Sequence, residues 1–361
     1  MRILLVYTDA DLSFNPYVKT IKDGLESVGC NINWGLERFW VDYNNYDIFH
    51  FQWPESIFEF KHVTDKEIDK LIFHIAKLKE KNKKIVYTRH NDKPHYSSDK
   101  NRLKLYEIVE NNSDAILHMG NFSVEQFKKQ NSNNKIKHFI IPHHTYDKIY
   151  TSCTKKDDAR KLLKINNKKF IFLCFGEFRD DEERDLVINS FKNLNYKNKY
   201  LIAPRFYKYQ INSKYLLTNL IHPRIILCFL KERIKYIHML RNSKLSAKMV
   251  AKDDLPYYFS ASDVVLIQRC HILNSGNLPM AFHFEKVVVG PKVGNVGEIL
   301  QETNNAVFDP RDQKSIVTAL LESIGKSQKN LGIKNKEYAI RKLKTQEISK
   351  SIKKIYESIL T

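Results

Sequence analysis

The sequence lacks several features that would settle its class at once. No run approaches the roughly 18–20 consecutive apolar residues that a membrane-spanning helix needs, so any contact with a membrane would be peripheral. The cysteines are scattered singly, with no CxxC pair: Cys30, Cys153, Cys174, Cys228 and Cys270. An odd, dispersed set argues against a disulfide framework or a zinc site and favours a reducing compartment.

Acidic residues are scarce relative to basic ones. Asp and Glu total 41 against 60 Lys and Arg, which gives a formal net charge of +19. This excess favours a polyanionic partner, such as nucleic acid, an anionic membrane face or a phosphorylated substrate. The chain has no aromatic RNP-type signature, no zinc-ligand spacing and no helix-turn-helix pattern, so nucleic-acid binding is the less favoured of these alternatives.

Apolar strands and helices alternate along most of the chain. In the first half, strands are predicted at 3–7, 47–52, 84–89, 115–118 and 138–141, with helices at 17–28, 65–80, 101–111 and 123–129. A polar linker over 144–161 precedes a second series of strands, at 170–175, 200–203, 247–250, 264–267, 287–290 and 306–308. This pattern predicts an α/β fold with parallel sheets covered on both faces.

The length of 361 residues suits two such domains. Two consecutive doubly wound units predict Rossmann-like domains over 1–150 and 151–330, facing a central cleft. A basic helix with no strand after it is predicted over 331–361.

The most informative segment is 263–300. It reads as a strand, a polar loop ending Asn274-Ser275-Gly276-Asn277, an amphipathic helix and another strand. A glycine turn at a helix N-terminus offers backbone N–H groups and the helix dipole to an anion. Because such a turn lies at the carboxyl end of a strand, where α/β folds bind ligands, we predict a site for a phosphate-bearing small molecule.

Residues 205–248 interrupt the alternation with ten Lys or Arg residues and a single acid, Glu232. If 224–241 is helical, one stripe contains Arg224, Lys231, Lys235 and His238, and the opposite side contains Ile226, Phe229, Ile237 and Leu240. Such a helix could rest on an anionic membrane surface, or it could be an ordinary outer helix with a solvated charged face. Arg233 falls within the apolar side and fits neither pattern well.

An ordered set of short pieces resembles the retaining GT-B glycosyltransferases related to glycosyltransferase family four, of the capsule or exopolysaccharide type. The pieces span nearly the whole chain: NPYVKTIKDGLESVG, FHFQWPE, YTRHNDKPH, IPHHTY, FGEFRDDEERDLVINSF, DDLPYYFSASDVVL, ILNSGNLPMAF and VGEILQETNNAVFDP. The resemblance implies that the second domain holds a nucleotide diphosphate sugar and that the first binds the acceptor. It also implies that the C-terminal helix over 331–361 crosses back and packs towards the first domain.

The resemblance also implies donor-binding residues. Arg179 matches the family's arginine that contacts the diphosphate, and Gly176 leaves room for close approach of the backbone. Arg205, at the end of the next strand, is a second candidate. The full donor-binding prediction is Gly176, Arg179, Arg184, Arg205, Val250, Asn274, Ser275, Gly276 and Asn277.

Other residues are assigned to catalysis and to the acceptor. His90 matches the family's histidine beside the transferred sugar, so it joins Arg179 as a predicted catalytic residue. His143 and His144 are weaker candidates. Asn15, Tyr17 and Trp53 lie on loops at the same predicted sheet edge, where aromatic faces could stack on an acceptor sugar.

Two departures from the family pattern affect the expected activity. Leu273 and Ala281 stand about where many relatives carry paired glutamates around the glycine loop, and Glu182 stands where relatives carry a lysine. Arg184 could replace that lysine's charge. A non-catalytic paralogue that binds nucleotide sugar or glycan therefore remains an alternative.

No metal or cofactor is predicted. Asp9-Ala10-Asp11 has the spelling of a metal-binding DxD pair, but it follows the first strand, and we interpret it as a solvated loop. No opposed carboxylate pair of a glycosidase stands out.

The resemblance thus implies transfer of a hexose-type unit, with retention, from a UDP- or GDP-sugar to a glycan or lipid-linked saccharide. It favours a cytoplasmic protein, peripheral on the inner face of the cell membrane.

Overall fold

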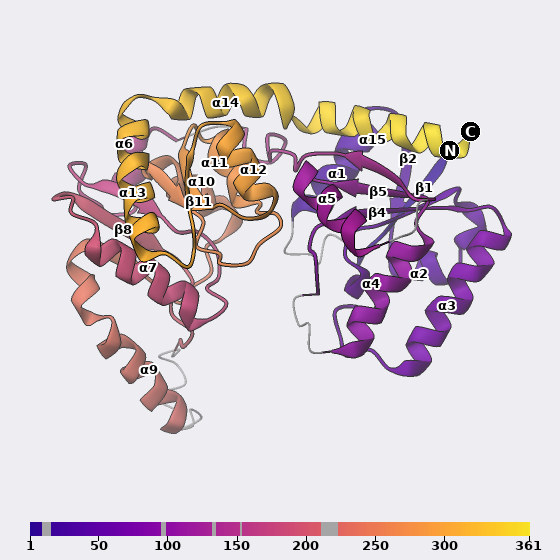
Figure 1. Ribbon diagram of the computed structural model, residues 1–361, viewed down its shortest axis with the longest axis horizontal. Helices are drawn as coiled ribbons and strands as arrows, with labels where there is room; N and C mark the ends of the chain where they lie inside the picture. Colours follow the sequence, from indigo (N-terminus) through magenta and orange to yellow (C-terminus); the bar gives the residue numbers. More distant parts are fainter. Residues whose placement is uncertain (9–15, 95–98, 132–134, 152–153, 211–222) are drawn as a thin grey trace. The chain divides into compact units, whose positions relative to one another are not determined.

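A computed structural model describes residues 1–8, 16–94, 99–131, 135–151, 154–210 and 223–361. These residues form two compact units (Figure 1). Unit 1 comprises Met1–Ile149, Ile272–Asn274 and Ala339–Thr361, and unit 2 comprises Tyr150–His271 and Ser275–Tyr338. Each unit holds a six-stranded parallel sheet flanked by helices, which is the predicted α/β class.

The sheet of unit 1 has the strand order β2-β1-β3-β4-β5-β6. Its strands are β1 (Arg2–Val6), β2 (Asn31–Trp34), β3 (Ile48–Phe51), β4 (Lys84–Arg89), β5 (Ala115–His118) and β6 (Lys137–Ile140). Its helices are α1 (Pro16–Ser27), α2 (Leu36–Trp40), α3 (Asp65–Glu80), α4 (Lys100–Asn112), α5 (Asn121–Gln130) and α15 (Thr345–Leu360). The strand order reverses between β1 and β3, which is where ligands bind in open α/β sheets.

Alternation along β1 divides the core of unit 1 between two faces of the sheet. Ile3 and Leu5 join the cluster formed with α1 and α15, whereas Leu4 and Val6 join the cluster with α3 and α4. Gly24 allows α1 and α15 to approach closely, because a Cβ there would lie 2.3 Å from Ser349 Oγ. The last helix is therefore a structural layer of unit 1.

The sheet of unit 2 has the strand order β12-β11-β10-β7-β8-β9. Its strands are β7 (Phe170–Leu173), β8 (Lys199–Ala203), β9 (Ser243–Leu245), β10 (Val264–Leu266), β11 (Val287–Pro291) and β12 (Ala306–Phe308). Its helices are α6 (Lys156–Leu162), α7 (Asp181–Asn193), α9 (Pro223–Lys235), α10 (Leu255–Ala261), α11 (Asn277–His283), α12 (Gly294–Glu302) and α13 (Gln313–Gln328). Counted within the unit, this is the dinucleotide-fold order 3-2-1-4-5-6, with its reversal between β7 and β10.

Four sequence predictions need correction. The strand predicted at 247–250 is instead β9 (Ser243–Leu245), which pairs with Leu201–Ala203. The sequence did not indicate it because its first residues are polar. Edge strand β2 was missed because only one of its four side chains is buried. The predicted linker over 144–161 contains the start of α6, in which buried Arg160 contacts the Asp263 carboxylate at 2.7 Å.

The fourth correction concerns the C-terminal segment, which is two helices instead of one. The helix α14 (Leu331–Lys342) ends where the carbonyl oxygen of Leu343 accepts a hydrogen bond from the Thr145 backbone N–H, at 2.7 Å. The division between the units falls within α14, since residues up to Tyr338 cluster with unit 2.

Gly332 is predicted to be essential for the stability of unit 2. A Cβ at this position would lie 2.0 Å from the Glu285 carbonyl oxygen, and backbone cannot move aside cheaply. We expect Gly332→Ala to lower the free energy of unfolding by about 3 kcal/mol or more. Gly325→Ala is the matched control, because its Cβ would meet nothing within 4 Å. That change should raise stability by about 0.5–1 kcal/mol, the usual helical gain of alanine over glycine. Denaturant unfolding followed by circular dichroism would measure both, and equal stability of the two variants would contradict the prediction.

Candidate functional site

At the carboxyl edge of the unit 1 sheet, His90 lies in a cluster of rings. It follows β4, and its ring stacks on Trp53 with centroids 3.8 Å apart and planes at 13°. Tyr17, from α1, meets His90 edge-on at 4.7 Å and stacks on His144 at 4.6 Å. His90 and Tyr17 are buried and Trp53 is half-buried. The structure therefore brings together three of the residues predicted for catalysis and acceptor binding.

A chain of buried side chains fixes the orientation of His90. Its Nε2 lies 3.0 Å from Gln52 Oε1, which can only accept, so Nε2 donates. Gln52 Nε2 lies 3.1 Å from His50 Nε2, and His50 Nδ1 lies 2.6 Å from Tyr356 Oη. With Gln52 as the donor to His50 Nε2, the His50 proton resides on Nδ1 and points to Tyr356. The relay thus fixes which ring nitrogen of His90 faces Gln52, and with it the orientation of the ring.

The three residues predicted to bind the acceptor differ in what the structure shows of their surroundings. One face of Tyr17 is covered by His144, so this side chain serves as packing between histidines. Trp53 packs on His90 with one face and keeps partial exposure. Asn15 and the Asp9-Ala10-Asp11 motif lie outside the described residues.

Three fully buried histidines in unit 1 predict a loss of stability in acid. Burial lowers the pKa of His50 to about 3, and burial with the nearby Arg89 charge lowers that of His118 to about 3. Burial lowers the pKa of His144 to about 4, against backbone hydrogen bonds that raise it. Below about pH 6.5 these histidines bind protons in the unfolded chain but stay unprotonated in the folded unit. The contribution to the free energy of unfolding that is present above that pH is therefore lost as pH falls towards about 4.

Each of these histidines can remove up to about 1.4 kcal/mol per pH unit. We expect the urea midpoint of unit 1 to fall substantially between about pH 7 and about pH 5. All three tryptophans, Trp34, Trp40 and Trp53, belong to unit 1, so their fluorescence reports this unit alone. A midpoint independent of pH would contradict the prediction.

In unit 2, two arginines lie at the point where the strand order reverses. Arg179 follows β7 and Arg269 follows β10. Glu183, buried in the first turn of α7, accepts a hydrogen bond from the Arg179 backbone N–H at 2.9 Å and pairs with the Arg269 guanidinium. Arg269 Nη2 also donates to the Glu177 carbonyl oxygen at 2.7 Å. One carboxylate thus holds the two loops together.

The electrostatics of Arg179 suit an anion. Partial desolvation and the neighbouring positive charge of Arg269 lower the pKa of Arg179, whereas Glu183 and Asp180 raise it. The positive charges of Arg179 and Arg269 repel each other. A diphosphate bound beside them would relieve this repulsion. Arg179 also lines a pocket of about 460 Å³, in which five cationic side chains face three acidic ones.

The predicted glycine turn is present, but contacts between its loop and a neighbouring loop are more prominent than the helix dipole. Asn277 Nδ2 donates to the Phe175 carbonyl oxygen at 2.7 Å, so the loop before α11 lies against the loop that contains Gly176. Gly176 has φ 102, which only glycine adopts without strain. Helix α11 has seven residues, and Ser275 and Gly276 lie just before it. The dipole of so short a helix attracts an anion less strongly than the two arginines do.

The other predicted donor residues lie in varied environments. Arg205 has left-handed backbone geometry, φ 57, and pairs with the Glu177 carboxylate. Asn274 clusters with unit 1 and donates from Nδ2 to the His90 carbonyl oxygen at 2.8 Å. Val250 lies in an irregular segment after β9 because the strand predicted there is absent.

Arg184 is a structural arginine. It is buried, with Nε donating to the Phe206 carbonyl oxygen at 2.8 Å, Nη1 to Asp181 at 3.0 Å and Nη2 to the Phe178 carbonyl oxygen at 3.3 Å. These bonds hold the guanidinium against the protein, but Arg184 also lines the pocket of Arg179, so its assignment to the donor stays a prediction. The two departures Leu273 and Ala281 are both buried apolar side chains.

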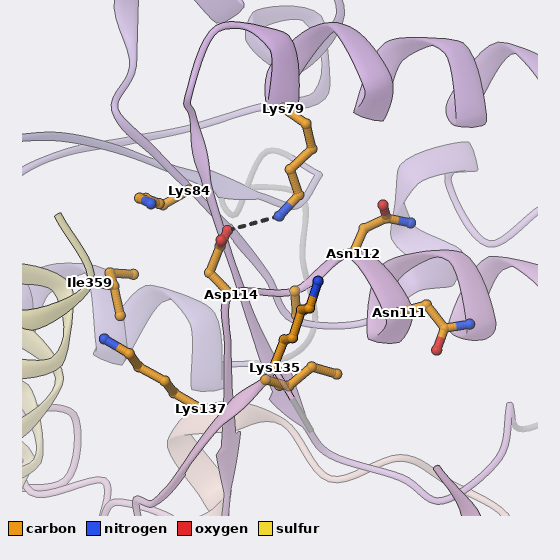
Figure 2. A pocket seen from close by; sticks show the side chains of 10 residues that line it. Lys79, Lys84, Asn111, Asn112, Asp114, Lys135, Lys137 and Ile359 are labelled. Atoms are coloured by element: carbon orange, nitrogen blue, oxygen red, sulfur yellow. Dashed lines mark hydrogen bonds and ion pairs between the residues drawn. The ribbon is translucent and has the colours of Figure 1, made fainter. Parts of the chain in front are cut away.

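A separate charged pocket of about 380 Å³ lies at the amino ends of β4 and β6 (Figure 2), the opposite sheet edge from His90. Its basic lining residues are Lys79, Lys84, Lys135 and Lys137. The Asp114 carboxylate pairs with Lys79 at 3.1 Å. Because α3 and α4 end here, these lysines complement the negative ends of two helix dipoles, and we assign no substrate to them.

Sequence reasoning missed four residues that organise the two sites: His50, Gln52, Glu183 and Arg269. A signal existed for the first two, because polar residues two apart at the end of an apolar strand share one face. Arg269 carried the same signal as Arg179, a cation placed just after a strand. Glu183 was not singled out because it lies within a run of acidic residues. In the described part of the chain, no group of three His, Cys, Asp or Glu side chains is arranged to hold a metal ion.

No family model matches the sequence, and no curated protein matches it. Solved structures do resemble the fold. Sucrose-phosphate synthase from Thermosynechococcus elongatus has a TM-score of 0.72 at 13% identity, covering 100% of this chain and 99% of that one. The Anabaena protein HepE in complex with UDP has a TM-score of 0.70 at 13% identity, covering 99% and 100%. A glycosyltransferase from Rickettsia africae has a TM-score of 0.66 at 12% identity, covering 100% and 98%. The fold is therefore GT-B over the whole chain, as the resemblance implied.

Proposed function

We propose that this protein is a glycosyltransferase that takes a hexose-type unit from a nucleotide diphosphate sugar. The observation that carries the proposal is the placement of two arginines at the strand-order reversal of unit 2, where Glu183 accepts from the Arg179 backbone N–H and pairs with the Arg269 guanidinium. A sugar nucleotide presents about two negative charges there. HepE, which shares the fold, has been solved with UDP, with UDP and glucose, and with UDP-glucose, which supports a nucleotide-sugar ligand for this chain.

The proposed chemistry needs positioning and charge stabilisation more than a protein nucleophile. The bond from the anomeric carbon to the diphosphate oxygen breaks, the acceptor hydroxyl attacks that carbon from the same face, and the leaving phosphate takes the hydroxyl proton. Arg179 would stabilise the negative charge that grows on the leaving oxygen. His90, oriented by Gln52, would lie beside the transferred sugar and help to position it.

For the acceptor, we propose a glycan or lipid-linked saccharide in capsule or exopolysaccharide synthesis. The proposal includes retention of the anomeric configuration and independence of metal. It places the protein at the inner face of the cell membrane, where lipid-linked intermediates are exposed to the cytoplasm. These finer points follow from the family resemblance and from the basic character of 205–248.

The test is a thermal-shift screen with UDP-, GDP- and ADP-sugars against the whole protein. We expect one nucleotide class to raise the unfolding temperature, because a ligand that binds only the folded state stabilises it. Sugar release in the presence of an acceptor extract then distinguishes an enzyme from a binding protein. Failure of every nucleotide to stabilise the protein would overturn the donor assignment.

A non-catalytic paralogue is the second candidate. The observation that favours it is the burial of Leu273 and Ala281, which stand about where many relatives carry carboxylates. Such a paralogue would show a thermal shift with a nucleotide sugar and no turnover with or without acceptor.

A further inference from the structure

Helix α9 exposes a row of large apolar side chains on unit 2. Figure 1 shows α9 running out from the unit, away from its sheet. Leu227, Leu230 and Ile234 are exposed by 52%, 49% and 67%, and Ile237 in the turn after the helix by 60%. Their spacing of three and four residues places the helical members within an arc of about 60°. We call these four residues the apolar ridge.

Apart from Ile237, the ridge differs from the apolar side that the sequence suggested. Another side of α9 holds the helix to unit 2: the Arg233 guanidinium lies 3.3 Å from the centroid of the Tyr207 ring, and Tyr236, just after the helix, is buried. Glu232 accepts backbone N–H bonds from Lys208 at 2.8 Å and Tyr209 at 3.1 Å. Arg233 is therefore an anchor towards the protein, which leaves the ridge pointing outward.

Basic side chains border the ridge along one side. Arg224, Lys231 and Lys235 fall within an arc of about 40° next to Leu227 on the helix surface. Lys235 pairs with Asp185 of α7 at 3.2 Å, an exposed ion pair that contributes little to stability. An apolar strip with lysines and arginines on one flank is the pattern of helices that lie in the plane of an anionic membrane surface.

We propose that the apolar ridge of α9 inserts into the interface of an anionic lipid bilayer while Lys231 and Lys235 contact its headgroups. No helix in the described part of the chain is long and apolar enough to cross a bilayer. A second copy of the chain is a poorer occupant, because antiparallel two-fold pairing of the ridge would bring the same cations against one another. The inference rests on the proposed function only for why the protein would work at a membrane.

The experiment is co-sedimentation of the full chain with vesicles of phosphatidylcholine, with and without phosphatidylglycerol. Wild-type protein should bind the anionic vesicles and bind neutral ones more weakly. The triple variant Leu227→Gln, Leu230→Gln and Ile234→Gln keeps every charge and should lose binding about tenfold or more. The control Ile72→Gln with Phe73→Gln removes two exposed apolar side chains from α3 and should bind like wild type. Unchanged unfolding temperatures would show that both variants fold.

The outcomes separate this inference from the proposed function. Vesicle binding without any nucleotide-induced thermal shift would support the ridge and contradict the glycosyltransferase proposal. A thermal shift without vesicle binding would overturn the ridge proposal alone. Equal vesicle binding by wild type and the triple variant would also overturn it. The same holds if wild type is a dimer that does not bind vesicles and the triple variant is a monomer.

Discussion

Replacing Arg179 with alanine should lower kcat/KM for sugar transfer by about 10²–10³-fold, or about 2.7–4 kcal/mol of transition-state stabilisation. In the proposed reaction, negative charge concentrates on the leaving diphosphate just where Arg179 and Arg269 converge. The Arg269 guanidinium already pairs with Glu183, whereas the Arg179 guanidinium forms no ion pair with any residue that the structure describes, so we expect Arg179 to make the larger contribution. The same variant should lose most of the nucleotide-induced thermal shift, because the ground-state diphosphate uses the same contact.

Two further variants make the measurement specific. Arg179→Lys keeps a positive charge without the planar fork, and it should recover part of the binding and less of the rate. Arg311→Ala removes an exposed arginine elsewhere in unit 2, before α13, and should leave both readouts unchanged. A value of kcat/KM for Arg179→Ala within about threefold of wild type would contradict the assignment of the diphosphate to this loop.

The fold could be predicted from sequence because its strands are apolar and its helices are well marked. β4, β5 and β12 were predicted with their observed bounds, as was α3, which begins at a capping box formed by Thr64 and Glu67. The errors occurred where tertiary pairing overrides the local pattern. β9 begins with Ser243 and Lys244, and it forms a strand only because β8 offers a backbone to pair with.

The candidate site was predictable in position and less so in composition. A cation or histidine just after an apolar strand can be read from sequence, and this rule located His90 and Arg179. It gave no information on what each side chain would touch. Arg184 bonds to backbone carbonyl oxygens, and Glu183, from the same helical turn, joins two loops far apart in sequence. Such partnerships depend on which loops the strand order brings together.

Replacing His90 with alanine should lower kcat by about 10²-fold, with a smaller change in KM. In the proposed mechanism, His90 orients the sugar while the bond to the diphosphate breaks, so its loss affects the transition state more than binding. Steady-state kinetics with the donor identified by thermal shift would measure the change. His62→Ala, which removes an exposed histidine, should behave like wild type.

Gln52 offers a sharper test, because it would act on the sugar only through His90. Gln52→Leu removes the acceptor for His90 Nε2–H and leaves the ring stacked on Trp53, free to rotate or change tautomer. We expect kcat to fall by about tenfold with KM nearly unchanged, and the fall should be largely absent when His90 is already alanine. Additive effects of the two substitutions would mean that Gln52 acts on stability or on another group, and the relay would then have no part in orienting His90. Non-additivity would instead tie Gln52 to the reacting sugar through His90, since the hydrogen bond between them fixes the orientation of the ring.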